Sequence, residues 1–356
     1  MQFVPTGGLK SAFAVAITIA AASLGGALFA FIGLPAAWLS GALVATSAIA
    51  IAGFPAQLPD GLRRATFIVL GISIGAAVTP ETIAGIRTWP ITMFFLVLSI
   101  PGAMIAVMIY LRWAGWDREV SFFASALGAM SAVVAAATDA GVDVRKVVLV
   151  QSVRIFVLVA FLPGILVGFG LAGEGNAVPP PSFEIGPVWE LALMGAVGIA
   201  GGLIADRLGV PGGLIVGAML VNAILHGTGY VRATVPLHIL IPCFILLGAF
   251  IGARFAGTEL SLLRKLLVHS FNAFVVAFAV TCLFAVVGAL IAGESIGKAI
   301  VAFAPGGLEA MIILAFVIGF DPAFVAAHHL VRFVLIALCL PIAARIMFGR
   351  ARGPDR

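Results

Sequence analysis

The chain has 356 residues, of which 62% are hydrophobic and only 10% are charged, and its formal net charge is +5. An ordinary soluble domain carries about 25% charged residues, and a fold in water cannot bury so many apolar side chains. The composition therefore excludes a soluble globular protein. It predicts an all-α polytopic membrane protein, because helices satisfy their own backbone hydrogen bonds within a bilayer.

Charge and cysteine usage exclude further classes. The 20 Lys and Arg residues lie scattered in loops without forming a basic patch, so we expect no direct binding of nucleic acid. Cys243, Cys282 and Cys339 stand singly within apolar segments. Such cysteines behave as small hydrophobic side chains, so we expect neither a disulfide nor a metal site.

Twelve apolar segments follow in chain order, some of them shorter than the ~20 residues of a full membrane span. The first resembles a signal peptide, but its length and the lack of a clear cleavage site favour a helix. Residues 173–186 form the longest polar, proline-rich connection and predict a linker. The segments cover 11–31, 34–52, 64–80, 90–111, 120–138, 147–171, 187–205, 212–226, 235–253, 268–292, 297–319 and 323–346.

The two halves of the chain match each other at an offset of 176 to 178 residues. This internal duplication predicts a first membrane repeat at 1–172, a second at 187–347, and a basic cytoplasmic tail at 348–356. The matching blocks are LPAAWLSGAL at 34–43 with VPGGLIVGAM at 210–219, VLGISIGA at 69–76 with LLGAFIGA at 246–253, and Asp143, Arg154 and Pro163 with Asp321, Arg332 and Pro341.

The distribution of basic residues indicates how the repeats are oriented. If all twelve segments cross, the repeats are parallel, with 11 Lys and Arg inside and 7 outside. If 120–138 and 297–319 are re-entrant, the count becomes 15 inside and 3 outside. The positive-inside rule favours the second topology. We therefore expect inverted repeats in a bacterial inner membrane, each with about five transmembrane helices plus one re-entrant or broken helix, and both termini in the cytoplasm.

Residue types in these two segments favour a broken backbone. Pro305, Gly306 and Gly307 lie near the centre of 297–319, where proline removes a hydrogen-bond donor and glycine permits non-helical conformations. The counterpart in 120–138 begins at Leu127 and Gly128 and lacks the proline. Since the intact break belongs to the second half, we expect the working site there.

Ionisable side chains within membrane segments are costly and point to function. Arg154 lies well inside its apolar segment, and Arg332 occupies the matching position. Each either binds an anion or ties down backbone carbonyls freed by a broken helix. Glu309 either pairs with Arg332 or carries protons, as His328 and His329 also could.

Other polar residues have simpler interpretations. Asp143 and Asp321 precede helical segments, where capping of the helix is the expected role. Asn222 is expected to form an interhelical hydrogen bond. The candidate substrate-binding residues are Pro305, Gly306, Gly307, Glu309, His328, His329, Arg332, Arg154, Gly128 and Ser131.

Inverted repeats with two broken elements are typical of secondary transporters, which hold their substrate at the bilayer midplane. The two arginines favour a small, anionic substrate. We expect no cofactor and no catalytic residues, and a homo-oligomer is compatible with the sequence.

The run APGGLEAMIILAFVIGFDPAFVAAHHLVRFVLI at 304–336 closely resembles the closing motif of the AbrB-like membrane family of Gram-negative bacteria. The repeated blocks fit this family too, over essentially the whole chain. Its members are described as an AbrB duplication and are often labelled ammonia monooxygenase or regulator. The resemblance implies regulation of gene expression or ammonia oxidation. The first repeat departs from the family pattern at 127–129 and at Ser131, which replaces the acid.

Neither label follows from the residues. A copper or iron oxygenase needs clustered ligands, and the adjacent His328 and His329 point about 100° apart on a helix. We therefore predict no enzyme. A sensor would be expected to carry an output module, for which the tail at 348–356 is too short. Transport is the preferred hypothesis, and a membrane sensor or regulator that acts through a partner is the alternative.

Overall fold

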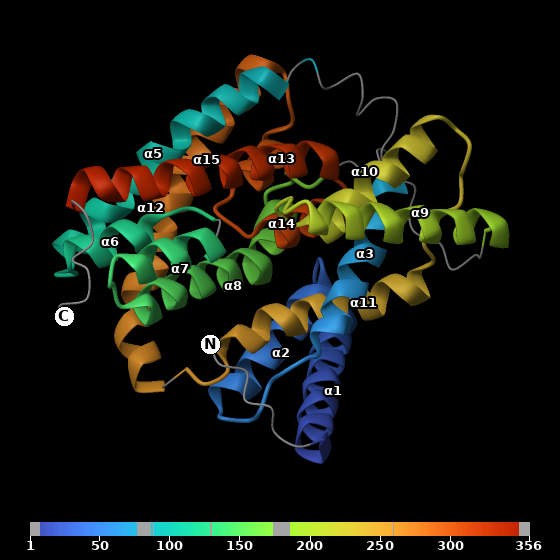
Figure 1. The fold of residues 1–356 in the computed structure, drawn as a ribbon, viewed down its shortest axis with the longest axis horizontal. Coiled ribbons are helices and arrows are strands. Elements are labelled where there is room, and N and C mark those ends of the chain that lie inside the picture. Colours follow the sequence, from blue (N-terminus) through green and yellow to red (C-terminus); the bar gives the residue numbers. More distant parts are fainter. Residues whose placement is uncertain are drawn as a thin grey trace. The chain divides into compact units, whose positions relative to one another are not determined.

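The computed structural model describes residues 8–76, 87, 89–128, 130–173, 186–258 and 260–348, and every regular element in these ranges is helical (Figure 1). The predicted all-α class is confirmed. The helices are α1 Gly8–Ile32, α2 Ala37–Ile51, α3 Asp60–Ala76, α5 Trp89–Trp113, α6 Arg118–Ser125, α7 Met130–Asp139, α8 Val144–Gly168, α9 Val188–Arg207, α10 Gly213–Gly227, α11 Leu237–Gly252, the short 3-10 turn η1 Ala253–Phe255, α12 Leu260–Ala292, α13 Ile296–Phe303, α14 Leu308–Val317 and α15 Pro322–Phe348.

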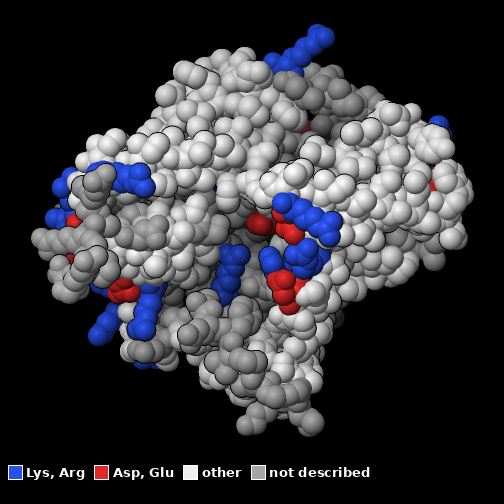
Figure 2. All heavy atoms as spheres, in the orientation of Figure 1, with Lys and Arg blue, Asp and Glu red and all other residues white. Residues whose placement is uncertain are grey.

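Seven helices within the described ranges are long and apolar enough to cross a membrane. They are α1, α5, α8, α9, α11 with η1, α12 and α15. Large apolar side chains stand exposed on them, and most of the face in Figure 2 carries no charged residue. The chain is therefore a multi-pass membrane protein. α2 and α10 have only 15 residues each, about 22 Å, which is less than the ~30 Å of the hydrocarbon core.

The chain divides into two compact units. The first unit comprises 1–79, 159–260 and 316–320, and the second comprises 80–158, 261–315 and 321–356. Each unit takes segments from both halves of the sequence. The predicted repeat boundaries are therefore not the boundaries of compact bodies, and the repeats remain a prediction. Most of the predicted linker and tail, 174–185 and 349–356, lies outside the described residues.

Glycine contacts hold the helices of the first unit together. A Cβ atom at Gly41 of α2 would lie 2.2 Å from the carbonyl oxygen of Gly25 in α1. A Cβ at Gly217 of α10 would lie 2.2 Å from the carbonyl oxygen of Gly201 in α9. Without side chains the backbones approach this closely, which is how membrane helices gain packing contacts. The two contacts are related by the offset of 176 residues seen in the sequence.

A second pair of glycine contacts joins helices from different halves of the sequence. Gly71 of α3 packs on the backbone of Ile215 in α10, where a Cβ would come within 2.5 Å of the carbonyl oxygen. Gly248 of α11 packs in the same way on Leu39 of α2, at 2.4 Å. Each half thus supplies the surface on which the other half's helix rests. A duplication predicts such reciprocal contacts.

The second unit contains both helix breaks. The first break separates α6 from α7, and the second separates α13 from α14. Each pair has helices of 8 and 10 residues, as its counterpart does. Both predicted breaks are confirmed. Gly128 has a φ of 100°, a conformation that side chains with a Cβ rarely adopt. Glycine is therefore retained there although the neighbouring proline is missing.

The second broken segment returns to the end where it began. Lys298 lies in the first turn of α13, and its Nζ is 4.5 Å from the centroid of the Phe324 ring, in the first turn of α15. Phe324 follows α14, so the chain runs through α13 and α14 and comes back to Lys298. This path is the one that a re-entrant hairpin requires. The direction of the repeats and the side of the termini remain predictions.

Candidate binding site at the broken helices

The second break is closed by Arg332, whose side chain is buried. Its Nη1 donates to the carbonyl oxygens of Phe303 at 3.3 Å and Ala304 at 2.6 Å, and its Nη2 donates to that of Gly306 at 3.0 Å. The last carbonyls of a helix lack partners within the helix, and Pro305 supplies no N–H. Arg332 therefore has the structural role that the sequence left open, which is to satisfy carbonyls freed by the break.

His329 completes this cluster. Arg332 Nη2 donates to His329 Nδ1 at 2.6 Å, and His329 Nε2 lies 3.2 Å from the carbonyl oxygen of Val301. Arginine can only donate, so Nδ1 accepts and Nε2 carries the proton of a neutral imidazole. His328 points elsewhere, to the carbonyl oxygen of Phe324 at 2.8 Å and to Thr92 of α5 at 2.8 Å. The two histidines thus point apart, as their adjacent positions on a helix predict, and only His329 bonds to Arg332.

The first break has an arginine in the same position, but this arginine makes fewer hydrogen bonds. Arg154 Nη1 donates to the carbonyl oxygen of Ala126 at 3.0 Å, a contact displaced by 178 residues from that between Arg332 and Ala304. Arg154 is also buried, yet its Nε has no hydrogen-bond partner among the described residues. Burial of a polar group without a partner is costly, so this position has unused bonding capacity.

Gln151 is a functional candidate that the sequence analysis missed. It precedes Arg154 by three residues, so both can share a face of α8. Its side chain is fully buried, and neither its Nε2 nor its Oε1 has a partner in the described part of the chain. The repeat offset could have identified it, because Gln151 occupies the position of His329.

The two breaks meet within the second unit. A Cβ at Gly128 would lie 3.5 Å from Arg332 Nε and 3.8 Å from the carbonyl oxygen of Gly306. Within the described ranges, neither Arg154 nor Arg332 forms a salt bridge with a carboxylate. The pairing of Glu309 with Arg332 that we considered is therefore not found, and the Glu309 side chain is half-buried. Among the described residues, these two buried cations therefore have no carboxylate partner to offset their burial.

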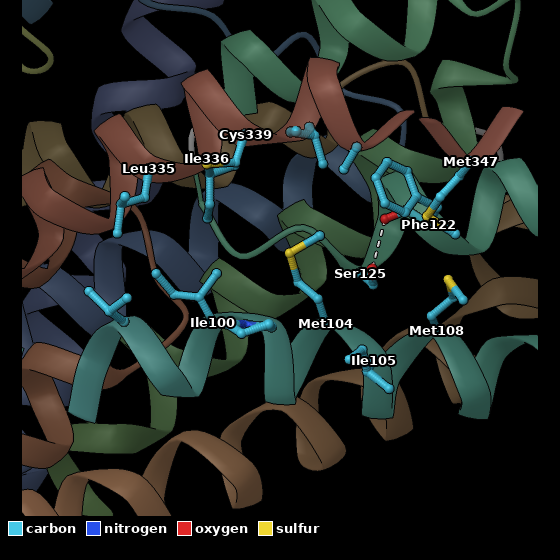
Figure 3. Close-up of a pocket in the computed structure, with 14 residues that line it drawn as sticks. Ile100, Met104, Ile105, Met108, Phe122, Ser125, Leu335, Ile336, Cys339 and Met347 are labelled. Atoms are coloured by element: carbon cyan, nitrogen blue, oxygen red, sulfur yellow. Dashed lines mark hydrogen bonds between the residues drawn. The ribbon is translucent and has the colours of Figure 1, made fainter. Parts of the chain in front are cut away.

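Two cavities adjoin the first break. A small one of about 10 Å³, room for about one water molecule, is lined by Arg154, Ser125 and Leu127 among others. A larger groove of about 420 Å³ lies between α5 and α15 (Figure 3). Ser125, the last residue of α6, lines both. Figure 3 shows Ile100 and Met104 of α5 facing Ile336 of α15 across the groove.

The remaining candidate residues have plain outcomes. Asp143 Oδ1 accepts from the backbone N–H of Arg145 at 3.1 Å, and Asp321 Oδ1 accepts from that of Ala323 at 2.9 Å, so both cap their helices as predicted. Asn222 donates to the carbonyl oxygen of Met194 in α9 at 3.4 Å, which confirms the interhelical bond. Ser131 lies in α7, but its side chain is outside the described residues.

The cysteines differ from one another more than expected. All three are free, and Cys243 is buried as predicted, whereas Cys339 is exposed and lines the groove. In the described part of the chain, no three His, Cys, Asp or Glu side chains come close enough together to hold a metal ion.

Comparisons with known proteins extend over most of the chain. The model of a family described as "Transition state regulatory protein AbrB" matches residues 38–348. "Uncharacterized protein YhjN" of Bacillus subtilis (strain 168) is 27% identical, over 92% of this chain and 92% of its own length. "Putative regulator AbrB" of Escherichia coli (strain K12) is 25% identical, over 90% of this chain and 92% of its own length.

Proposed function

We propose that this chain, which belongs to the family described as "Transition state regulatory protein AbrB", is a secondary transporter of a small anionic solute. One observation carries the proposal: two buried arginines lie at two converging helix breaks, without a carboxylate partner in the described ranges. Non-helical backbone at membrane depth is tolerated where it lines a cavity or is buried in protein.

The proposed arrangement places inverted repeats in a bacterial inner membrane, with both termini in the cytoplasm. The broken helices then lie near the midplane, where transporters hold their substrates. The return of α13 and α14 to the end marked by Lys298 and Phe324 supports this topology. The equal lengths of the two broken pairs support two related hairpins.

Flux through reconstituted protein tests the proposal. Liposomes with the purified chain are exposed to labelled phenylacetate, acetate, succinate, glutamate and phosphate in turn, and uptake is compared with that of empty liposomes. We expect uptake of at least one anion, and its loss in Arg154→Gln. Arg145→Gln is the matched control, because it removes an exposed charge from the same helix. Background uptake of every anion, or full uptake by Arg154→Gln, would contradict the proposal.

A regulatory role is the second candidate, and the descriptions of the family and of the Escherichia coli relative favour it. Such a role would be indirect, through a solute that the protein moves or through a partner protein. Ammonia oxidation has less support, because the ring nitrogens of His328 and His329 are all engaged in hydrogen bonds. Flux by the isolated chain separates transport from a role that needs a partner.

A further inference from the structure

The two breaks differ in what they leave for a ligand. Arg332 uses both of its terminal nitrogens on carbonyls of its own break and on His329. Arg154 makes one such bond, and its Nε stays without a partner in the described part of the chain. The bonding capacity for a ligand therefore lies at the first break, in the opposite half from the one that the intact Pro305 suggested.

The groove beside the first break has a distinct chemistry. Its lining is apolar apart from Ser125, whose hydroxyl already donates to the carbonyl oxygen of Phe122 at 2.7 Å. Its volume of about 420 Å³ lies within the range of small-molecule pockets, about 300 to 1,000 Å³. Met104, Met108 and Met347 line it (Figure 3). Methionine side chains adapt to ligands of varied shape.

Ser125 connects these two features. It lines both the groove and the small cavity that Arg154 also lines. A ligand with an apolar body in the groove would therefore have its polar end near Ser125 and Arg154. Only a negatively charged end would neutralise the buried guanidinium, and a carboxylate offers acceptor oxygens that suit arginine.

We infer that the ligand is an apolar monocarboxylate, with its hydrocarbon body in the groove between α5 and α15 and its carboxylate on Arg154. The inference rests on the proposed function and specifies its substrate class. Gln151 supports the site as a second buried donor on the same helix. A membrane lipid chain is the competing occupant of the groove, but it carries no anionic group to the Arg154 end.

Binding by the full chain in lipid nanodiscs tests this inference with three probes. Phenylacetate has both the apolar body and the acid, phenylacetamide has the same shape without the charge, and acetate has the acid alone. We expect phenylacetate to bind about tenfold or more tightly than either, because a charged hydrogen bond and a buried ring each contribute at least that factor. Equal binding of phenylacetate and phenylacetamide, or of phenylacetate and acetate, would overturn the inference.

Variants assign each part of the ligand to its place. Arg154→Gln should remove the preference for phenylacetate over phenylacetamide, and Met104→Trp should remove the preference over acetate by filling the groove. Ile109→Trp is the control, since Ile109 is exposed on α5 outside the groove lining. Should Arg154→Gln not fold, Gln151→Leu replaces it, with a reduced acid preference expected. Unchanged preferences in both Met104→Trp and the acid-end variant would refute the site.

The same probes separate this inference from the proposed function. Phenylacetate that binds as expected but does not enter liposomes would refute transport and leave the binding site standing. Flux of another anion that depends on Arg154, without binding of phenylacetate, would refute the apolar substrate and leave transport standing.

Discussion

The two matching arginines allow one prediction in which each variant controls for the other. Arg332→Ala should destabilise the protein more than Arg154→Ala does. Both residues are 3% exposed, so the benefit of removing a buried charge is similar in the two variants. The difference in stability then depends on the hydrogen bonds that each arginine makes.

The structure gives the size of that difference. Arg332→Ala leaves the carbonyl oxygens of Phe303, Ala304 and Gly306 without this donor, whereas Arg154→Ala leaves that of Ala126. The Ala304 carbonyl oxygen still accepts from the backbone N–H of Gly306 at 2.7 Å. Arg332→Ala therefore leaves one more carbonyl without a partner than Arg154→Ala does, at a cost of about 1 to 3 kcal/mol. At roughly 2 °C or more per kcal/mol, the midpoint of Arg332→Ala should lie at least about 2 °C below that of Arg154→Ala.

The assay is the fraction of protein that remains monodisperse after heating in detergent, followed by size-exclusion chromatography. Both variants are heated at the same rate, because thermal unfolding of such proteins is governed by kinetics. We expect Arg154→Ala to keep a midpoint close to that of the wild type and to lose ligand binding. Equal midpoints for the two variants, or a lower one for Arg154→Ala, would refute the assignment of Arg332 to structure.

Three further outcomes are expected. Gly217→Ala should lower stability by about 1 to 3 kcal/mol, because its Cβ would overlap the Gly201 carbonyl, whereas Gly164→Ala, with open space around it, should not; equal melting midpoints would contradict this. Burial raises the pKa of the Asp321 carboxyl above its ordinary value of 3.8, so the wild-type protein should lose stability as pH rises from 3.8 to the raised pKa. Asp321→Asn, which keeps the cap, should lack this loss. Parallel stability–pH curves for the two proteins would contradict the expected protonation of Asp321. In a cysteine-free background, Lys298→Cys and Asp321→Cys should react with an impermeant maleimide from the same side, and labelling from opposite sides would exclude the re-entrant hairpin.

Much of the architecture follows from residue types in the sequence. Composition predicts the helical membrane class, and the Pro305 and Gly306 pair predicts a break where α13 ends. The weaker break at Gly128 was predicted only through the repeat offset, and the φ of 100° there explains why this glycine is kept. These features depend on local chemistry, so a single chain suffices to read them.

The site could be predicted less well, because it depends on which bonds are already made. The sequence treats Arg154 and Arg332 as equals, and only the hydrogen bonds show that Arg332 is engaged at its own break. Gln151 was not selected, since a lone glutamine in an apolar segment carries little signal. The groove could not be predicted either, because its lining side chains are ordinary for membrane helices.

The difference between the halves suggests how one unit could serve both stability and binding. Two equally open breaks would each leave buried polar groups without partners, a cost that rises with every break. At the second break the histidine at position 329 helps to close the cluster around Arg332. At the first break Gln151 occupies the matching position, and its side chain has no hydrogen-bond partner in the described part of the chain. The second break thus gives the unit a satisfied, fixed reference, and the first keeps the free donors that a ligand needs.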